Sequence, residues 1–335
     1  MKRKGVSYAK WGYIFSAPFA IGFLLFMLYP IVNTFLMGFT DMVGVAKLTE
    51  PMHVNPAGIF KVYKDLLHNV TFGKSIVTTF ILWILNFIPQ ITVALVLAAW
   101  FTNDRLKIRG KGFFKVVFYL PNIITAASVA VLYSSFFQYS KEVMGPANEL
   151  FMKLGLIDQP MDFFVNRGAT RWIVIFIQFW MWYGYTMIVL ISGILGISPE
   201  LFEAADIDGA NGFQKFLYVT IPSIKTILLY TFITSLIGGL QMYDIPYLLT
   251  QGNGEPDGAI RTTSVFIFKQ AFGNVPSYNV AAAASMIMFI IIGILSAIVF
   301  FLMRDKDEAE LHKLIKRQEK EYKAKLKAEK AQGGK

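Results

Sequence analysis

The chain has 335 residues, of which 55% are hydrophobic, 16% aromatic and only 16% charged, and its net charge is +10. Soluble domains carry about 25% charged residues, so this composition excludes a disordered chain and argues against an ordinary soluble enzyme. The chain contains no cysteine, which excludes a disulfide framework and a cysteine-ligated metal site.

Long uncharged segments indicate that the chain crosses a membrane. A spanning helix needs about 20 apolar residues to cross the hydrocarbon of a bilayer. A helix on the surface of a soluble core would instead carry polar side chains along one face. Six uncharged runs reach or approach the required length, and we expect one transmembrane helix in each of residues 11–40, 75–103, 116–140, 172–199, 226–243 and 270–303.

The distribution of charge predicts the orientation of these spans. With the N-terminus inside, the inside segments carry 22 of the 32 Lys and Arg residues and the outside segments carry 10. Cytoplasmic loops are enriched in Lys and Arg, so we expect a multi-pass cell-membrane protein with both termini in the cytoplasm. Residues 1–11 are then a basic cytoplasmic arm and residues 304–335 a charged cytoplasmic tail. Topology alone explains the basic charge, so no nucleic-acid partner is expected.

The loop between the fourth and fifth spans, residues 198–222, is predicted to be helix–turn–helix on the cytoplasmic side. Ser198 is a favourable N-cap and Pro199 suits the first helical position. Gly209 can adopt the left-handed conformation that ends a helix, and a second short helix then runs until Pro222 opens the next span. The first helix exposes apolar residues outside the membrane. Either the protein's own loops, the lipid interface or a partner must cover them.

This loop resembles the EAA loop of binding-protein-dependent ABC importer permeases. The resemblance rests on Glu203-Ala204-Ala205, on Gly209 and on Val219-x-Ile221-Pro222, together with the position between two spans. It implies a coupling helix that docks into a cleft of a separate cytoplasmic ATPase. The residues expected at this coupling site are Leu201, Phe202, Glu203, Ala204, Ala205, Asp208, Gly209 and Pro222.

Other segments narrow the resemblance to sugar importers. They are Tyr13 to Pro30 in the first span, Phe118 to Asn122 at the start of the third, and Tyr243 to Pro256 after the fifth. Residues 12–303 therefore resemble the transmembrane domain of the larger permease subunit of maltose and multiple-sugar importers. This implies an all-α integral membrane fold, the six-helix type I ABC importer domain with a cytoplasmic coupling helix. The chain lacks a large extra outside domain, and Asn253-Gly254-Glu255 loosens the family's Gly-Gly-Pro pattern.

Motifs for catalysis are missing. No G-x-x-x-x-G-K-[ST] sequence occurs, the three histidines are scattered, and no catalytic triad is visible. We therefore expect no enzyme activity, no catalytic or metal site and no cofactor on this chain. The resemblance implies that two partner ATPase subunits bind ATP and Mg. It also implies a second homologous permease and an extracytoplasmic sugar-binding protein.

The resemblance implies the import of a carbohydrate, an oligosaccharide in particular. Polar and small side chains recur on single faces of the spans, either for helix packing or to line a cargo path. Glycerol phosphate, a polyamine or an amino acid is the alternative cargo, although a charged cargo should leave ionisable residues inside the spans, and the six runs contain none. A secondary transporter would show mid-membrane acids and inverted repeats, which are not visible. Because they flank the coupling loop, spans four and five are expected to supply the path through Gln178, Trp182, Tyr185, Ser235, Gly239 and Met242.

Overall fold

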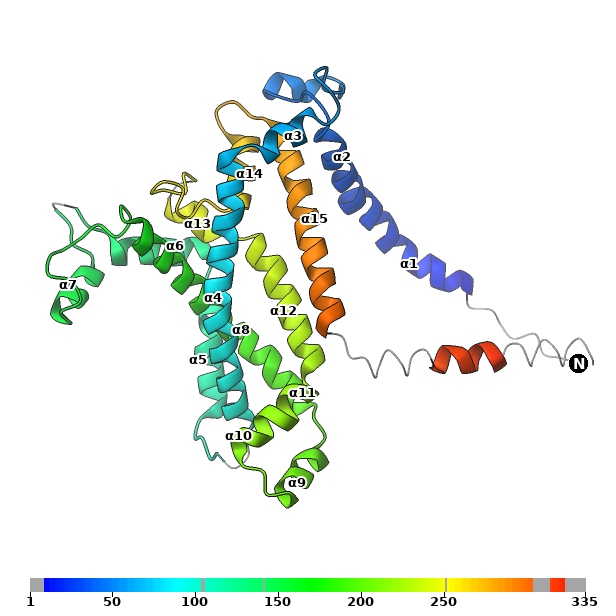
Figure 1. The fold of residues 1–335 in the computed structure, drawn as a ribbon, viewed down its shortest axis with the longest axis vertical. Helices are drawn as coiled ribbons and strands as arrows, with labels where there is room; N and C mark the ends of the chain where they lie inside the picture. The colour runs from blue at the N-terminus through cyan, green and yellow to red at the C-terminus, as the bar shows by residue number, and fades with distance from the viewer. Residues whose placement is uncertain (1–8, 104–105, 141, 251, 304–313, 323–335) are drawn as a thin grey trace, which may run out of the picture. The chain divides into compact units, whose positions relative to one another are not determined.

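The computed structural model describes residues 9–103, 106–140, 142–250, 252–303 and 314–322. Within these ranges the regular structure is helical and no strand is formed, which confirms the predicted all-α fold (Figure 1). The chain divides into two compact units, which are described separately below. The first comprises Met1–Asn86, Ile124–Gln178 and Gly238–Gly293, and the second comprises Phe87–Ile123, Phe179–Ile237 and Ile294–Lys335.

Five helical stretches are long and apolar enough to cross a membrane, and they match five of the six predicted spans, including the short fifth. These stretches are Lys10–Met37, Val70–Thr102, Arg167–Leu195, Lys225–Leu249 and Tyr278–Met303.

The third predicted span is broken into two helices. They are α5 (Lys111–Ile123) and α6 (Ala126–Phe137). Pro121 removes one backbone donor near the end of α5, and the hydroxyl of Thr125 accepts a hydrogen bond from the amide of Ser128 at the start of α6. A helix end and a helix start therefore meet in mid-run, and the number of spans is six if the bent pair is counted as one.

The first unit gathers the N-terminal helices and the three loops predicted to lie outside. Each of its shorter helices begins and ends inside the unit, whereas α4 (Val70–Thr102), α8 (Arg167–Leu195) and α15 (Tyr278–Met303) only begin there. The shorter helices are α1 (Ala9–Phe23), η1 (Leu24–Leu28), α2 (Tyr29–Met37), η2 (Val45–Thr49), α3 (Lys61–Leu67), α6, α7 (Pro146–Lys153), α13 (Asp244–Leu249) and α14 (Thr263–Phe272).

Buried polar side chains join the elements of the first unit. The backbone amide of Thr263, at the start of α14, donates to the hydroxyl of Thr79 on α4 at 2.9 Å. The side-chain amide of Asn279, at the start of α15, donates to the carbonyl of Thr40 at 3.0 Å. In a membrane-embedded bundle such partners replace the water that polar groups would otherwise bind.

The segment after α13 is an irregular loop that side chains hold in place. The Nε of Arg171 on α8 donates to the carbonyl of Ala259 at 2.8 Å, and the guanidinium of Arg261 donates to the carbonyl of Asn253. Gly254 has a φ of +68°, and a Cβ at this position would lie 2.9 Å from the backbone nitrogen of Arg261. The conformation of the loop is therefore determined by hydrogen bonds from arginine side chains to its backbone and by the close approach of Gly254 to Arg261.

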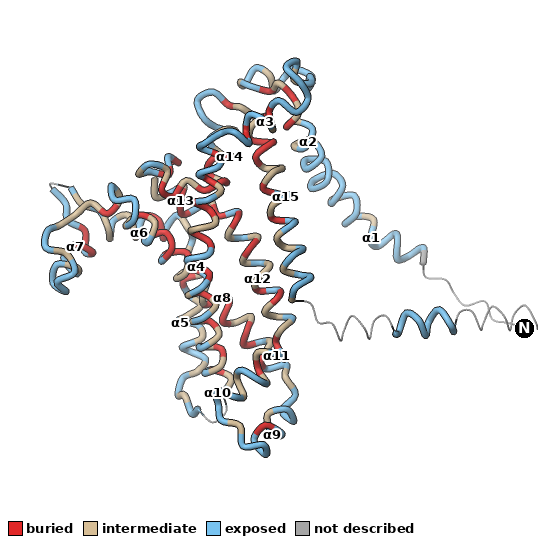
Figure 2. Tube along the Cα trace, viewed as in Figure 1, coloured by how far each residue is buried: buried red, intermediate tan, exposed pale blue. Residues whose placement is uncertain are grey.

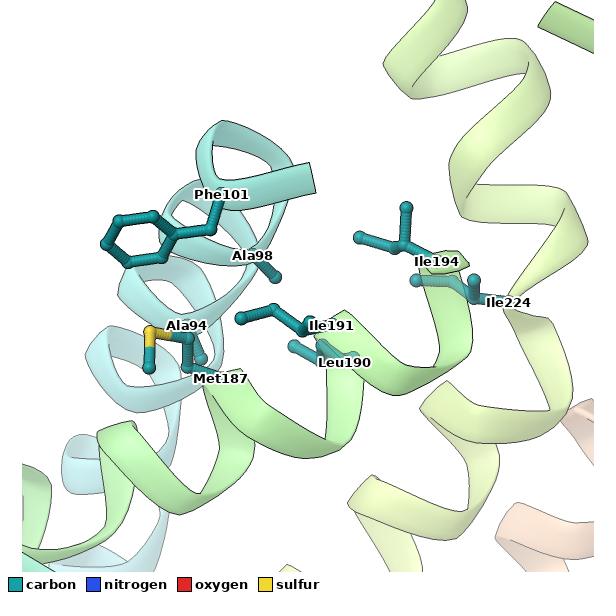
Figure 3. Close-up of a cluster of buried hydrophobic side chains, with 8 residues drawn as sticks. All are labelled: Ala94, Ala98, Phe101, Met187, Leu190, Ile191, Ile194 and Ile224. Carbon is teal, nitrogen blue, oxygen red and sulfur yellow. The ribbon is translucent and has the colours of Figure 1, made fainter. Parts of the chain in front are cut away.

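The second unit contains two features of interest. One is an apolar core between α4 and α8, and the other is the 198–222 loop. Besides α5 and the remaining parts of α4, α8 and α15, it holds α9 (Pro199–Ile207), α10 (Gly212–Lys215), η3 (Phe216–Thr220), α11 (Ile221–Ser223) and most of α12 (Lys225–Leu240). One face of α4 packs on one face of α8 around a buried apolar cluster. Figure 3 shows its members, which are Ala94, Ala98, Phe101, Met187, Leu190, Ile191, Ile194 and Ile224.

Burial differs strongly among the spans (Figure 2). The most apolar window of the first span has no buried residue, whereas 56% of the corresponding window of α8 is buried. The first span thus presents its apolar side chains outward, and α8 forms the core. Most of the predicted cytoplasmic arm and tail lies outside the described residues; residues 9–11 of the arm belong to α1, and residues 314–322 of the tail are helical.

Candidate functional site

The 198–222 loop begins as the sequence predicts. Ser198 occupies the N-cap position of α9 with extended backbone angles, and Pro199 is the first helical residue. The hydroxyl of Ser198 makes no capping hydrogen bond, so the residue caps by backbone conformation, and its carbonyl accepts from the amide of Leu201 at 3.2 Å. The sequence therefore predicts the start of α9 correctly, although the side-chain hydrogen bond expected of a serine N-cap does not form.

The turn of the loop centres on Gly209. Its φ of +75° lies in the left-handed region, as predicted, and glycine adopts this conformation without a steric cost. The amide of Ala210 donates to the carbonyl of Ala205 at 2.9 Å, and the amide of Gly209 donates to the carbonyl of Asp206 at 3.1 Å. These two bonds close the end of α9 in the manner of a Schellman motif.

The second half of the loop is more irregular than the single helix predicted. Asn211 and Gln214 form a reciprocal capping box at the start of α10, and the Asn-x-x-Gln spacing is the sequence signal that could have indicated it. The helix then widens into the π turn η3. Pro222 lies inside α11, and the fifth span begins only at Lys225. A wide turn next to a proline is a common way to accommodate its missing donor.

Both ends of the loop pack on the same buried core. Ile224, just after Pro222, is 1% exposed and belongs to the cluster between α4 and α8 in Figure 3, and Ile197, just before α9, packs against that cluster. Between these anchors the loop leaves Ile207 88% exposed and Phe213 69% exposed. An element that is anchored at both ends and apolar at its surface is suited to binding another protein.

The eight predicted coupling residues lie close together in sequence but differ in exposure. Ala205 is buried at the inner face of α9 and Phe202 is half-buried. The side chains of the other non-glycine members face outward: Leu201, Glu203, Ala204, Asp208 and Pro222 are exposed. An ion pair that sequence reasoning missed joins Asp206 to Lys215, with the carboxylate and the ammonium group 2.6 Å apart.

The six predicted cargo-path residues fall in both units. Trp182 and Tyr185 on α8 are brought together, with ring centroids 6.1 Å apart in an edge-to-face arrangement. Gly239 packs on the indole of Trp83. The other positions are Gln178, buried on α8, Ser235, half-buried on α12, and Met242, which is buried just beyond the end of α12 rather than on its helical face.

A separate cavity of about 780 Å³ lies in the first unit among α6, α7 and the start of α8. Its walls are apolar and largely aromatic, and none of the six cargo-path residues lines it. The lining residues are Leu132, Tyr133, Phe136, Phe137, Phe151, Phe163, Ala169, Trp172, Ile173 and Phe176.

Several apolar spans and an anchored two-helix loop between the fourth and fifth of them define a polytopic α-helical membrane protein. The chain belongs to the family of binding-protein-dependent transport system inner membrane components, which it matches over residues 74–306. It is thus a permease that spans the membrane several times, as predicted.

Individual relatives cover nearly the whole chain. The lactose transport system permease protein LacF of Rhizobium radiobacter is 29% identical over 88% of this chain and 94% of its own length. The arabinooligosaccharides transport system permease protein AraP of Bacillus subtilis is 30% identical over 85% of this chain and 86% of its own. A solved bacterial alginate ABC transporter, in complex with an alginate pentasaccharide-bound periplasmic protein, has a chain with a TM-score of 0.69. That chain is 23% identical and covers 87% of this chain and 93% of its own length, which shows the shared fold.

Proposed function

We propose that this chain is the permease subunit of an ATP-driven carbohydrate importer, with an oligosaccharide as the preferred cargo. The observation that carries the proposal is the similarity to the lactose and arabinooligosaccharide permeases over at least 85% of the chain. The six predicted spans contain no Asp, Glu, Lys, Arg or His. A charged cargo would need such side chains along its path to compensate its charge within the membrane, so their absence supports a neutral cargo.

The ATPase is proposed to be a separate subunit that binds the 198–222 loop. In the predicted topology the loop lies on the side of the membrane where the Lys and Arg residues concentrate, which supports a cytoplasmic position for it and for both termini. Ile207 and Phe213 supply exposed apolar surface for contact, and the backbone conformation of Gly209 aims the two helices. The chain carries no phosphate-binding loop of its own, so ATP and Mg belong to the partner.

Two further partners complete the proposed assembly. A second homologous permease would cover apolar surface that this chain leaves exposed along its first span. An extracytoplasmic sugar-binding protein would deliver the cargo, since the solved alginate transporter forms a complex with a periplasmic protein that holds an alginate pentasaccharide. Inside the membrane, the edge-to-face pair Trp182 and Tyr185 offers ring faces on which a pyranose can stack, and Gln178 offers an amide for its hydroxyls.

Uptake by the assembled transporter in proteoliposomes tests this proposal. The chain, its second permease, the ATPase subunits and the binding protein are combined, and the vesicles are given labelled lactose, arabinotriose, glycerol 3-phosphate or glutamate. We expect ATP-dependent accumulation of a sugar and none of the charged solutes. Accumulation of a charged solute instead of either sugar would overturn the carbohydrate assignment, and accumulation without ATP would overturn the ABC mechanism.

A further inference from the structure

The ion pair between Asp206 and Lys215 bridges the two helices of the 198–222 loop. Asp206 lies in the last turn of α9, and Lys215 is the last residue of α10. The ammonium group of Lys215 donates a charge-assisted hydrogen bond to the carboxylate of Asp206, with the two atoms 2.6 Å apart. The Lys215 side chain is only 12% exposed and that of Asp206 is 40% exposed, so the pair is partly shielded from water.

The other hydrogen bonds described in the loop join residues that are closer in sequence. The backbone bonds at Gly209 and Ala210 close the end of α9, and the capping box of Asn211 and Gln214 starts α10. These contacts shape the two helix ends, but each lies on one side of the turn or inside it. The ion pair instead joins positions nine residues apart and thereby opposes a change in the angle between α9 and α10.

The position of Lys215 connects the pair to the fifth span. Lys215 directly precedes η3, which lies beside α9, and η3 continues through α11 to Ile224. Ile224 packs in the core between α4 and α8, and α12 begins at the next residue. A displacement of α9 can therefore reach the core and α12 through η3, provided that the turn at Gly209 does not flex.

We propose that Asp206 and Lys215 are positioning residues that make the 198–222 loop move as one piece, so that movement imposed on α9 reaches α12. This inference rests on the proposed function of the loop as the ATPase-binding element. With the pair broken, the two helices can pivot about the turn, and part of the ATPase movement is lost before it reaches the spans. The ATPase still binds, because the exposed apolar side chains remain.

The test compares Asp206→Asn, Lys215→Gln and the charge exchange Asp206→Lys/Lys215→Asp in the assembled transporter in proteoliposomes. The measurement is the number of sugar molecules imported per ATP hydrolysed, which does not depend on the amount of complex. We expect a severalfold fall in this ratio for each single variant, unchanged subunit composition, and recovery in the charge exchange. Glu200→Gln, which removes an exposed carboxylate from the same helix, is the matched control and should retain the ratio.

A reversible bridge provides a second measurement on a single protein. Since the chain has no cysteine, Asp206→Cys/Lys215→Cys carries a unique thiol pair that a short bifunctional thiol reagent can link and a reductant can release. The ratio should be high when the thiols are linked and low after release. Equal ratios in both states, or single variants that keep the normal ratio, overturn the positioning role.

The outcome also separates this inference from the proposed function. If Gly209→Val abolishes stimulated ATP hydrolysis while Asp206→Asn keeps the normal import ratio, the loop couples but the ion pair does not position it. If Gly209→Val leaves stimulated hydrolysis and import unchanged, the loop is not the coupling element, and both proposals fail.

Discussion

The side-chain amide of Gln90 on α4 donates a hydrogen bond of 2.8 Å to the hydroxyl of Thr186 on α8. Both residues are buried, with exposures of 5% and 2%, in helices that pass the length and hydropathy requirements for membrane spans. Two polar side chains that satisfy each other between helices thereby specify how α4 and α8 face one another.

Removing either partner is expected to destabilise the second unit. Gln90→Leu or Thr186→Val should each lower the free energy of unfolding by about 0.6 kcal/mol, the average measured for hydrogen bonds between membrane helices, and by no more than about 1.7 kcal/mol. Reversible unfolding in mixed micelles measures the loss. The double variant should be destabilised by less than the sum of the single variants, since the second substitution removes a group that is already unpaired. Strict additivity would show that the bond contributes nothing.

The left-handed conformation of Gly209 leads to a prediction with a neighbouring control. Gly209→Ala should cost about 1–2 kcal/mol in the loop and reduce stimulated ATP hydrolysis, because a side chain disfavours a φ of +75°. Gly212→Ala is the control, because a Cβ at either glycine meets no atom within 4 Å and only Gly209 has a positive φ. Hydrolysis by the assembled transporter measures the effect. Equal activity of the two variants would contradict a conformational role for Gly209.

Gly239 and Gly238 allow a similar comparison inside the fifth span. A Cβ at Gly239 would overlap the indole ring of Trp83, whereas a Cβ at Gly238 would meet nothing within 4 Å. Gly239→Ala should therefore force α12 away from α4 and lower the melting temperature in detergent. Gly238→Ala should be neutral or slightly stabilising, because alanine favours a helix more than glycine does. If both variants melt at the same temperature, the close packing of Gly239 on Trp83 is not important for stability.

Thr262 links the residues just after α12 to the start of α14. Its buried hydroxyl donates to the carbonyl of Met242 at 2.7 Å and accepts from the amide of Val265 at 3.3 Å. Thr262→Val loses the helix cap and leaves a buried carbonyl unpaired, which should cost about 1–3 kcal/mol. Hydrogen exchange at the first amides of α14 should accelerate. Thr262→Ser keeps the hydroxyl and should exchange at the normal rate, and acceleration in the serine variant would refute this account.

The spans were predictable because lipid imposes a simple requirement, an uninterrupted apolar run of sufficient length. That requirement predicts the fifth span correctly despite its short run, since the charge at Lys225 coincides with the first residue of α12. It missed the break before Ala126, because the run continues through Thr125 without a charge even though Thr125 and Ser128 form a capping pair. The helical period of 3.6 residues holds only within a continuous helix. Met242 is assigned to the cargo path as part of the fifth span, but α12 ends at Leu240, so that period does not place Met242.

Much of the 198–222 loop was predictable for a different reason, because local backbone chemistry determines its shape. Pro199 and Gly209 occupy the positions that their conformational preferences indicate. The π turn η3 and the Asp206–Lys215 ion pair were not predictable, because they depend on how α9 lies beside the second half of the loop. Sequence spacing alone does not show that two opposite charges nine residues apart will meet.

Gly254 has a consequence for how this outer loop can diverge among related chains. Two independent features exclude a side chain at this position. The positive φ is unfavourable for any residue with a Cβ, and a Cβ would also overlap the backbone of Arg261. A library randomised over residues 252–258 should return glycine at 254 in nearly every functional clone. Asn253 is exposed and has no positive φ, so it should accept more residue types, each losing the hydrogen bond that its side chain accepts from Lys269. The segment Asn253-Gly254-Glu255, at which the sequence is expected to depart from a Gly-Gly-Pro pattern, thus holds one position that requires glycine beside one that does not.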